Sequence, residues 1–214
     1  MIKNINNNND SFIIRIDSDK SKDLETMAYE IEQRCKNISY LLNKNVSFTN
    51  HLIKKQFDEL TERIIRYEDL KNSLSDSTVI PESIKRLGEN HSVYWDLDFN
   101  TLEITVTDNG LDLGTSIKSA FKIPQEISDK MRDLSIKEQA LYEVYGYLVS
   151  SYPSINTDAY RNFETMKENV SKEFSDMKKD LVVKYAIPFM NEKNITTKFT
   201  WNLNFKTAEV DIKY

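Results

Sequence analysis

The sequence WDLDFNTLEITV at residues 95–106 returns near the C-terminus as WNLNFKTAEVDI at residues 201–212. The two tryptophans are 106 residues apart, which is close to half of the 214-residue chain. Matches at similar offsets are spread over both halves, such as Phe57 with Phe163 and Ile80-Pro81 with Ile187-Pro188. A repeat of this period indicates that one structural unit was copied in tandem.

Each of the two segments predicts a β-hairpin. Apolar and polar residues alternate on both sides of a two-residue turn at Asn100-Thr101, which pairs position 97 with 104 and 95 with 106. All apolar side chains then lie on one face, and a slip of one residue would expose all of them to water. The same register works in the second copy. We expect Trp95 and Trp201 to be buried under helices in equivalent roles.

Apolar residues spaced by three and four predict two long amphipathic helices in each half, folded back on each other as antiparallel hairpins. The first pair has its apolar positions at Leu24, Ala28, Ile31, Cys35, Ile38 and Leu42, then at Ile53, Phe57, Leu60, Ile64 and Tyr67. The second pair has them at Ile127, Met131, Leu134, Leu141, Tyr145 and Leu148, then at Phe163, Met166, Val170, Phe174, Met177 and Leu181. Thr49 or Asn50 is placed to cap the second helix. Ser18-Asp19-Lys20 matches Ser128-Asp129-Lys130 at an offset of 110, so we expect the second copy's first helix to be shorter by about one turn.

The predicted fold class is α+β, a tandem duplication of a long antiparallel helical hairpin followed by a β-hairpin. Apolar stretches at 12–16 and 120–123 can add a strand before each helical hairpin, which gives a β-α-α-β-β unit. The predicted organisation is a flexible Asn-rich tail, a first repeat unit, a connecting turn and a second repeat unit, at residues 1–10, 11–107, 108–115 and 116–214. The sequence leaves open whether the two units pack as one pseudo-twofold domain.

Composition and charge narrow the class of protein. The net charge is −5 and no basic cluster stands free of acidic neighbours, so we expect no nucleic-acid binding. No apolar run is long enough for a membrane span, and the single Cys35 cannot form an internal disulfide. These features predict an intracellular, cytoplasmic protein or one carried in a virus particle. The richness in Asn, Lys and Ile suggests an AT-rich genome, such as that of a phage.

Signatures of catalysis and of cofactor binding are weak. Cys35 lies on the apolar seam of a helix, where a thiol stays protonated, so we interpret it as a core residue. One cysteine and two histidines do not supply a zinc site. The loop 108–114 lacks the later acidic ligands of a calcium-binding EF-hand loop, and we interpret it as a turn. The sequence therefore predicts no enzyme, cofactor, metal or small-molecule ligand.

The polar faces of the two hairpins are the candidate protein-binding sites. Their residues are Asp96, Asp98 and Glu103 in the first copy, and Asn202, Asn204 and Glu209 in the second. Three carboxylates on one face could also bind a metal or act as an acid and a base.

The sequence is consistent with two functions for the protein. The first is a non-enzymatic structural or adaptor protein that contacts other proteins or itself, as a component of a larger assembly such as a phage particle. The alternative is a small acidic inhibitor, of the immunity or antitoxin type, that blocks one target protein.

Overall fold

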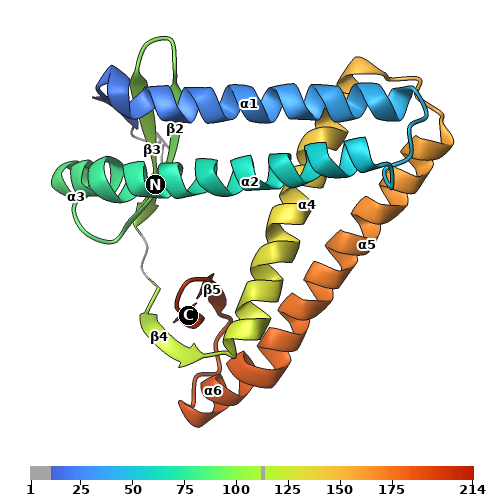
Figure 1. The fold of residues 1–214 in the computed structure, drawn as a ribbon. Coiled ribbons are helices and arrows are strands. Elements are labelled where there is room, and N and C mark those ends of the chain that lie inside the picture. The colour runs from blue at the N-terminus through green and yellow to red at the C-terminus, as the bar shows by residue number, and fades with distance from the viewer. Residues whose placement is uncertain (1–10, 112–113) are drawn as a thin grey trace, which may run out of the picture. The chain divides into compact units, whose positions relative to one another are not determined.

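The computed structural model describes residues 11–111 and 114–214, and Figure 1 shows their arrangement within each part of the chain. The elements of the first half are β1 (Ser11–Arg15), α1 (Ser18–Asn43), α2 (His51–Leu74), the π-helical turn η1 (Ser75–Val79), α3 (Ile80–Leu87), β2 (His91–Asp98) and β3 (Glu103–Leu111). Those of the second half are β4 (Ser116–Lys122), α4 (Gln125–Ser151), α5 (Asp158–Leu181), the π-helical turn η2 (Val182–Ala186), α6 (Ile187–Glu192), β5 (Thr200–Asn204) and β6 (Glu209–Lys213). The protein is therefore α+β, and its described elements follow the same order in both halves.

Each half forms one three-stranded antiparallel sheet, with the strand orders β1-β3-β2 and β4-β6-β5. Trp95 lies opposite Val106 and Leu97 lies opposite Ile104, so the predicted hairpin register is confirmed. In the second sheet, Trp201 lies opposite Ile212 and Leu203 opposite Val210. The strands expected before the helical hairpins are β1 and β4, and each pairs with the last strand of its own half.

The loops of the two hairpins differ from the prediction. The β2–β3 ladder ends at the pair Asp98–Glu103, so the loop is the four residues Phe99–Leu102 and not a two-residue turn. Leu102 has φ +57°, and Ala208 at the end of the matching loop has φ +56°. The Asn100 N–H donates to Asp98 Oδ1 at 2.8 Å and the Lys206 N–H donates to Asn204 Oδ1 at 3.0 Å, and these hydrogen bonds favour the wider loop.

Long antiparallel helices form as predicted, α1 with α2 and α4 with α5 (Figure 1). The Asn50 side chain accepts a hydrogen bond from the Leu52 N–H at 2.9 Å, and Thr157 accepts one from the Tyr160 N–H at 3.1 Å, so both act as N-caps. The expectation that the first helix of the second half is shorter by about one turn is wrong, because α1 has 26 residues and α4 has 27. The match at an offset of 110 did not reflect structural position. The buried serines Ser21 and Ser128 are each the fourth residue of their helix.

Both second helices continue through a π-helical turn into a short helix that the sequence analysis did not anticipate. The Ile80 N–H bonds the Ser75 carbonyl, and the Ile187 N–H bonds the Val182 carbonyl. The next residue in each case is a proline, Pro81 or Pro188, which has no N–H and whose ring collides with the carbonyl four residues earlier. The wider π turn accommodates each proline without ending the helix.

The chain divides by packing into two compact units. The first contains the described residues of Met1–Glu30 and Ile65–Leu113, and the second contains Ile31–Ile64 and the described residues of Gly114–Tyr214. These units are a division by contacts, whereas the ranges 11–107 and 116–214 are the repeat units predicted from the sequence. In the first unit, the sheet packs on helical residues to form a core of Ile14, Ile16, Leu24, Leu74, Val79, Ile104 and Val106.

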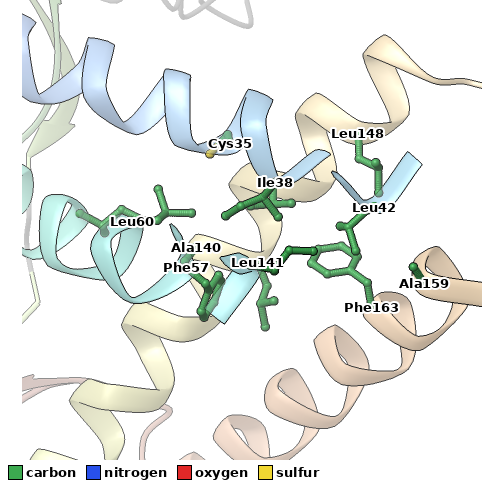
Figure 2. Packing of buried hydrophobic residues seen from close by; sticks show 13 residues of the cluster. Cys35, Ile38, Leu42, Phe57, Leu60, Ala140, Leu141, Leu148, Ala159 and Phe163 are labelled. Carbon is green, nitrogen blue, oxygen red and sulfur yellow. The ribbon is translucent and has the colours of Figure 1, made fainter. Parts of the chain in front are cut away.

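The second unit has two cores. In one, shown in Figure 2, α1, α2, α4 and α5 contribute Cys35, Ile38, Leu42, Ile53, Phe57, Leu60, Ile64, Ala140, Leu141, Val144, Leu148, Ala159 and Phe163. Cys35 has no exposed surface, which confirms it as a core residue, and burial raises the pKa of its thiol to about 12. In the other, sheet β4-β6-β5 packs on helices through residues that include Met131, Phe174, Leu181, Met190, Val210 and Ile212.

The two tryptophans are only half-buried, so the expectation that both are buried under helices is too strong. Both pack against the core of their own sheet. Trp95 lies on β2 and Trp201 on β5, which are edge strands among the described residues. At an edge the helices cover less of the inner face than they do at the central strands β3 and β6.

Candidate protein-binding face

Sheet β1-β3-β2 has one face against helices and one exposed face, which we call the outer face of the first sheet. Cross-strand pairing arranges the outer face in three rows. These rows are Ser11 with Thr107 and Tyr94, Ile13 with Thr105 and Asp96, and Arg15 with Glu103 and Asp98. The structure therefore brings the candidate residues Asp96, Asp98 and Glu103 onto one face, with Asp98 and Glu103 directly opposite each other.

Two of these carboxylates interact within the sheet. Arg15 Nε donates to Glu103 Oε1 at 3.0 Å, although the Arg15 side chain is 85% exposed. Asp98 Oδ1 accepts from the Asn100 N–H at 2.8 Å, and this hydrogen bond is the main reason why the pKa of Asp98 is lowered. Asp96 is exposed and has no hydrogen bond or ion pair to another described residue, so of the three carboxylates it is the one that no described group already binds.

Exposed apolar side chains lie among these carboxylates. Tyr94 is 63% exposed and Ile13 is 51% exposed, and both belong to the rows described above. The sequence analysis did not name either residue. Tyr94 could have been found from the strict alternation that places it with Asp96 and Asp98. Ile13 could not, because residues 12–14 are all apolar and do not reveal which of them faces outward.

The outer face of the second sheet is more polar than that of the first. Its acidic side chains form hydrogen bonds and an ion pair with residues of the same sheet. Asn202 lies opposite Asp211 and Asn204 opposite Glu209. A bulge in β4 places the Ser119 N–H 2.8 Å from Asp211 Oδ1 and the Ser119 hydroxyl 3.1 Å from Glu209 Oε2. Lys118 adds an ion pair with Asp211 at 3.1 Å. The Ser119 N–H is the leading cause of a lowered pKa of Asp211.

A pocket of about 160 Å³ lies beside β2 in the first unit. Its lining combines apolar, aromatic and charged side chains from Leu24, Tyr67, Lys71, Tyr94, Trp95, Asp96, Leu97 and Phe99. Lys71 Nζ lies 5.6 Å from the centre of the Trp95 ring and 5.9 Å from that of Tyr67, within the range of cation–π attraction. More open hollows lie along α4 near Gly146 and between Met27 and Leu70, but neither adjoins the candidate residues.

Side chains that could bind a metal ion are scattered over the described residues. Among them, no group of three or more His, Cys, Asp or Glu side chains is arranged to hold a metal ion. His91 Nδ1 and Asp108 Oδ2 are 2.9 Å apart at one end of the β2–β3 pair, and this hydrogen bond is the leading cause of a lowered pKa of Asp108. Asp108 also accepts from the Gly110 N–H at 2.8 Å, where Gly110 has φ +94°. Residues 108–111 of the predicted connecting turn therefore belong to β3, while 112–113 lie outside the described residues.

Within residues 11–111 and 114–214, none of the helices combines the length and the apolar character that a membrane crossing requires. Comparison of the chain with protein-family models, with curated proteins and with solved structures finds no match.

Proposed function

We propose that this chain is a tandem duplication that serves as a non-enzymatic structural or adaptor protein, and that the outer face of its first sheet contacts another protein. The observation that carries the proposal is the exposure of Tyr94 and Ile13 beside Asp96, whose carboxylate has no hydrogen bond or ion pair to any residue that the structure describes. Tyrosine is enriched at protein interfaces, where it offers a large apolar ring together with a polar hydroxyl. A protein partner that buries these side chains gains about 25 cal/mol for each Å² of apolar surface removed from water.

The proposed duplication rests on features that recur at equivalent places in the two halves. Both halves have the same order of strands in the sheet and a π-helical turn before an Ile-Pro pair. Asp98 and Asn204 each bind the backbone of their own hairpin loop. Duplication suits an adaptor or an assembly component, because one chain then presents two related surfaces that can diverge to meet different partners. In this proposal the protein acts inside the cell or in a virus particle.

A second candidate function is the blocking of one target by an acidic face. It is favoured by the clustering of Asp96, Asp98 and Glu103 on a single hairpin. An inhibitor of this kind is a monomer when free and forms a tight one-to-one complex. An assembly component instead joins a larger particle or a defined oligomer of itself. The mass of the complex therefore separates the two functions.

Affinity capture with matched variants tests the proposal. The tagged chain, its Tyr94→Ala variant and its Asn202→Ala variant are used to capture proteins from the native lysate. Captured complexes are identified by mass spectrometry and sized by light scattering. The proposal expects a stoichiometric protein partner that the wild type and Asn202→Ala retain and that Tyr94→Ala loses. Equal recovery with all three chains, or recovery of no protein at all, would contradict the assignment of this face.

A further inference from the structure

We infer that the free edge of β2 accepts an extended segment of a partner protein as a fourth strand, and that this segment alternates basic and apolar residues. The inference rests on the proposed function, because it specifies how the first sheet would contact a partner. Three features of the first unit support it. They are the open edge of β2, the half-covered apolar side chains on its inner face and the acidic side chains on its outer face.

The edge of β2 is suited to strand addition. β3 is the central strand of the sheet, so β2 has no neighbouring strand on its other side among the described residues. Edge strands are commonly protected by lysine, proline or a bulge. Strand β2, HSVYWDLD, contains neither lysine nor proline. Its register shift falls between His91 and Val93, which leaves Val93–Asp98 as a regular edge with backbone N–H and C=O groups that a further strand could bind.

The inner face of β2 is incompletely covered. Val93, Trp95 and Leu97, together with Phe99 of the following loop, pack on the first core but are only partly buried, whereas Ile104 and Val106 on the neighbouring strand have no exposed surface. The 160 Å³ pocket opens here, between β2 and the α2 residues Tyr67 and Lys71. It is smaller than the roughly 300 to 1,000 Å³ of sites for drug-sized ligands. One inward-facing apolar side chain of an added strand would lie at the mouth of this pocket, against the exposed parts of Trp95 and Leu97, and would extend the core past Trp95.

The outer face supplies the preference for basic residues. Successive side chains of a strand alternate between the two faces, so the residues of an added strand next to its pocket residue would lie beside Asp96 and Asp98. Asp96 has no partner among the described residues, and Asp98 presents a second carboxylate whose pKa is lowered chiefly by the hydrogen bond from the Asn100 N–H. Lysine or arginine at these positions forms opposite-charge cross-strand pairs. Pairing of β2 with a second copy of itself would bring neither lysine nor arginine to Asp96 and Asp98, because the strand HSVYWDLD contains neither, so the edge favours a basic partner over a homodimer.

The probe for this inference is the acetylated nine-residue peptide KVKVKVKVK, in which lysine and valine alternate. Its matched control, KKKKKVVVV, has the same composition and charge but cannot place lysine and valine on opposite faces of a strand. Binding is measured at physiological salt, which suppresses non-specific attraction to the acidic protein. Trp201→Phe leaves Trp95 as the single tryptophan of the chain, so its fluorescence reports the pocket directly. Hydrogen exchange on the wild-type protein provides a second readout that does not depend on this variant.

The alternating peptide should bind one-to-one, change the Trp95 fluorescence and slow amide exchange in β2, with an affinity about tenfold or more above that of the block peptide. Asp96→Lys should weaken binding by about tenfold or more, while Asn202→Lys on the second sheet should leave it unchanged. The inference would be overturned if both peptides bound with equal affinity, or if the alternating peptide slowed amide exchange in a segment other than β2. It would also be overturned if Asp96→Lys left the affinity for the peptide unchanged. If the peptide fails but Tyr94→Ala still abolishes capture of a partner, strand addition is wrong and the proposed function stands. If both fail, the proposed function falls as well.

Discussion

The two sheets share one framework and differ where another molecule could touch them. In the second sheet, the edge-strand residue Leu203 is only 7% exposed, and the β4 bulge binds the carboxylates of Asp211 and Glu209. In the first sheet, the matching Leu97 is half-buried and Tyr94 is 63% exposed. The second sheet thus binds these two carboxylates itself and covers the apolar side chain of its edge residue Leu203. The first sheet leaves acidic and apolar side chains of its edge strand exposed to a partner, which is why we assign the protein-binding face to the first sheet.

The largest expected effects are losses of stability, and they test whether the two sheets contribute equally to the folding of the protein. Ile104→Ala on β3 and Ile212→Ala on β6 each remove a side chain with no exposed surface from a central strand. Each should lower the free energy of unfolding by about 2 to 5 kcal/mol, through lost burial and the cavity left behind. Urea unfolding followed by the fluorescence of Trp95 or Trp201, each made the single tryptophan, checks this. A near-zero cost at only one position would show that the two sheets do not contribute equally.

Substitution of the two tryptophans should have similar effects on stability but different effects on peptide binding. Trp95→Ala and Trp201→Ala each remove a half-buried indole, and each should cost about 2 kcal/mol, less than for a fully buried ring. Only Trp95 lines the pocket beside β2, so only Trp95→Ala should also weaken the alternating peptide. Unfolding curves and peptide titrations by calorimetry measure the two effects. Equal loss of peptide binding in both variants would place the binding surface elsewhere.

The loop carboxylate Asp98 makes the first hairpin sensitive to acid. Its pKa is lowered in the folded protein from the ordinary value of 3.8, chiefly by the Asn100 N–H. A lowered folded-state pKa gives stability that is present above pH 3.8 and is lost as the pH falls through the folded-state pKa. Asp98→Asn should keep the loop, because Asn204 binds the matching loop in the second sheet. It should also remove this contribution to acid sensitivity.

Thermal unfolding between neutral pH and about pH 2 measures this effect. The matched variant is Asp211→Asn, because the pKa of Asp211 is also lowered and its side chain is held by Ser119 and Lys118 of the second sheet. It should likewise flatten the pH dependence, but it should cost stability at neutral pH because it loses the ion pair. An Asp98→Asn protein with the pH dependence of the wild type would show that the loop hydrogen bond contributes nothing measurable.

The sequence was sufficient to predict the hairpin registers and the long helices, because the spacing of their apolar residues allows only one arrangement that places all of them on one face. It was not sufficient for the loops, since Leu102 and Ala208 adopt a left-handed conformation that their residue types do not suggest. Nor did it indicate that Ile-Pro follows a π-helical turn. At the candidate face, alternation located Asp96, Asp98 and Glu103. It could not locate Arg15 beside Glu103, because that pair depends on β1 lying next to β3.

The smallest expected effect on stability belongs to that Arg15–Glu103 ion pair. The Arg15 side chain is 85% exposed, so solvent screens the attraction, and Arg15→Ala should lower the free energy of unfolding by at most about 1 kcal/mol. The same change removes a positive charge from the outer face of the first sheet and frees the Glu103 carboxylate. Binding of the basic alternating peptide should therefore strengthen as stability falls slightly. Lys118→Ala breaks the corresponding ion pair of the second sheet and should leave peptide binding unchanged. If Arg15→Ala weakens the peptide instead, the attraction does not come from the acidic side chains of this face, and the asymmetry between the two sheets has another basis.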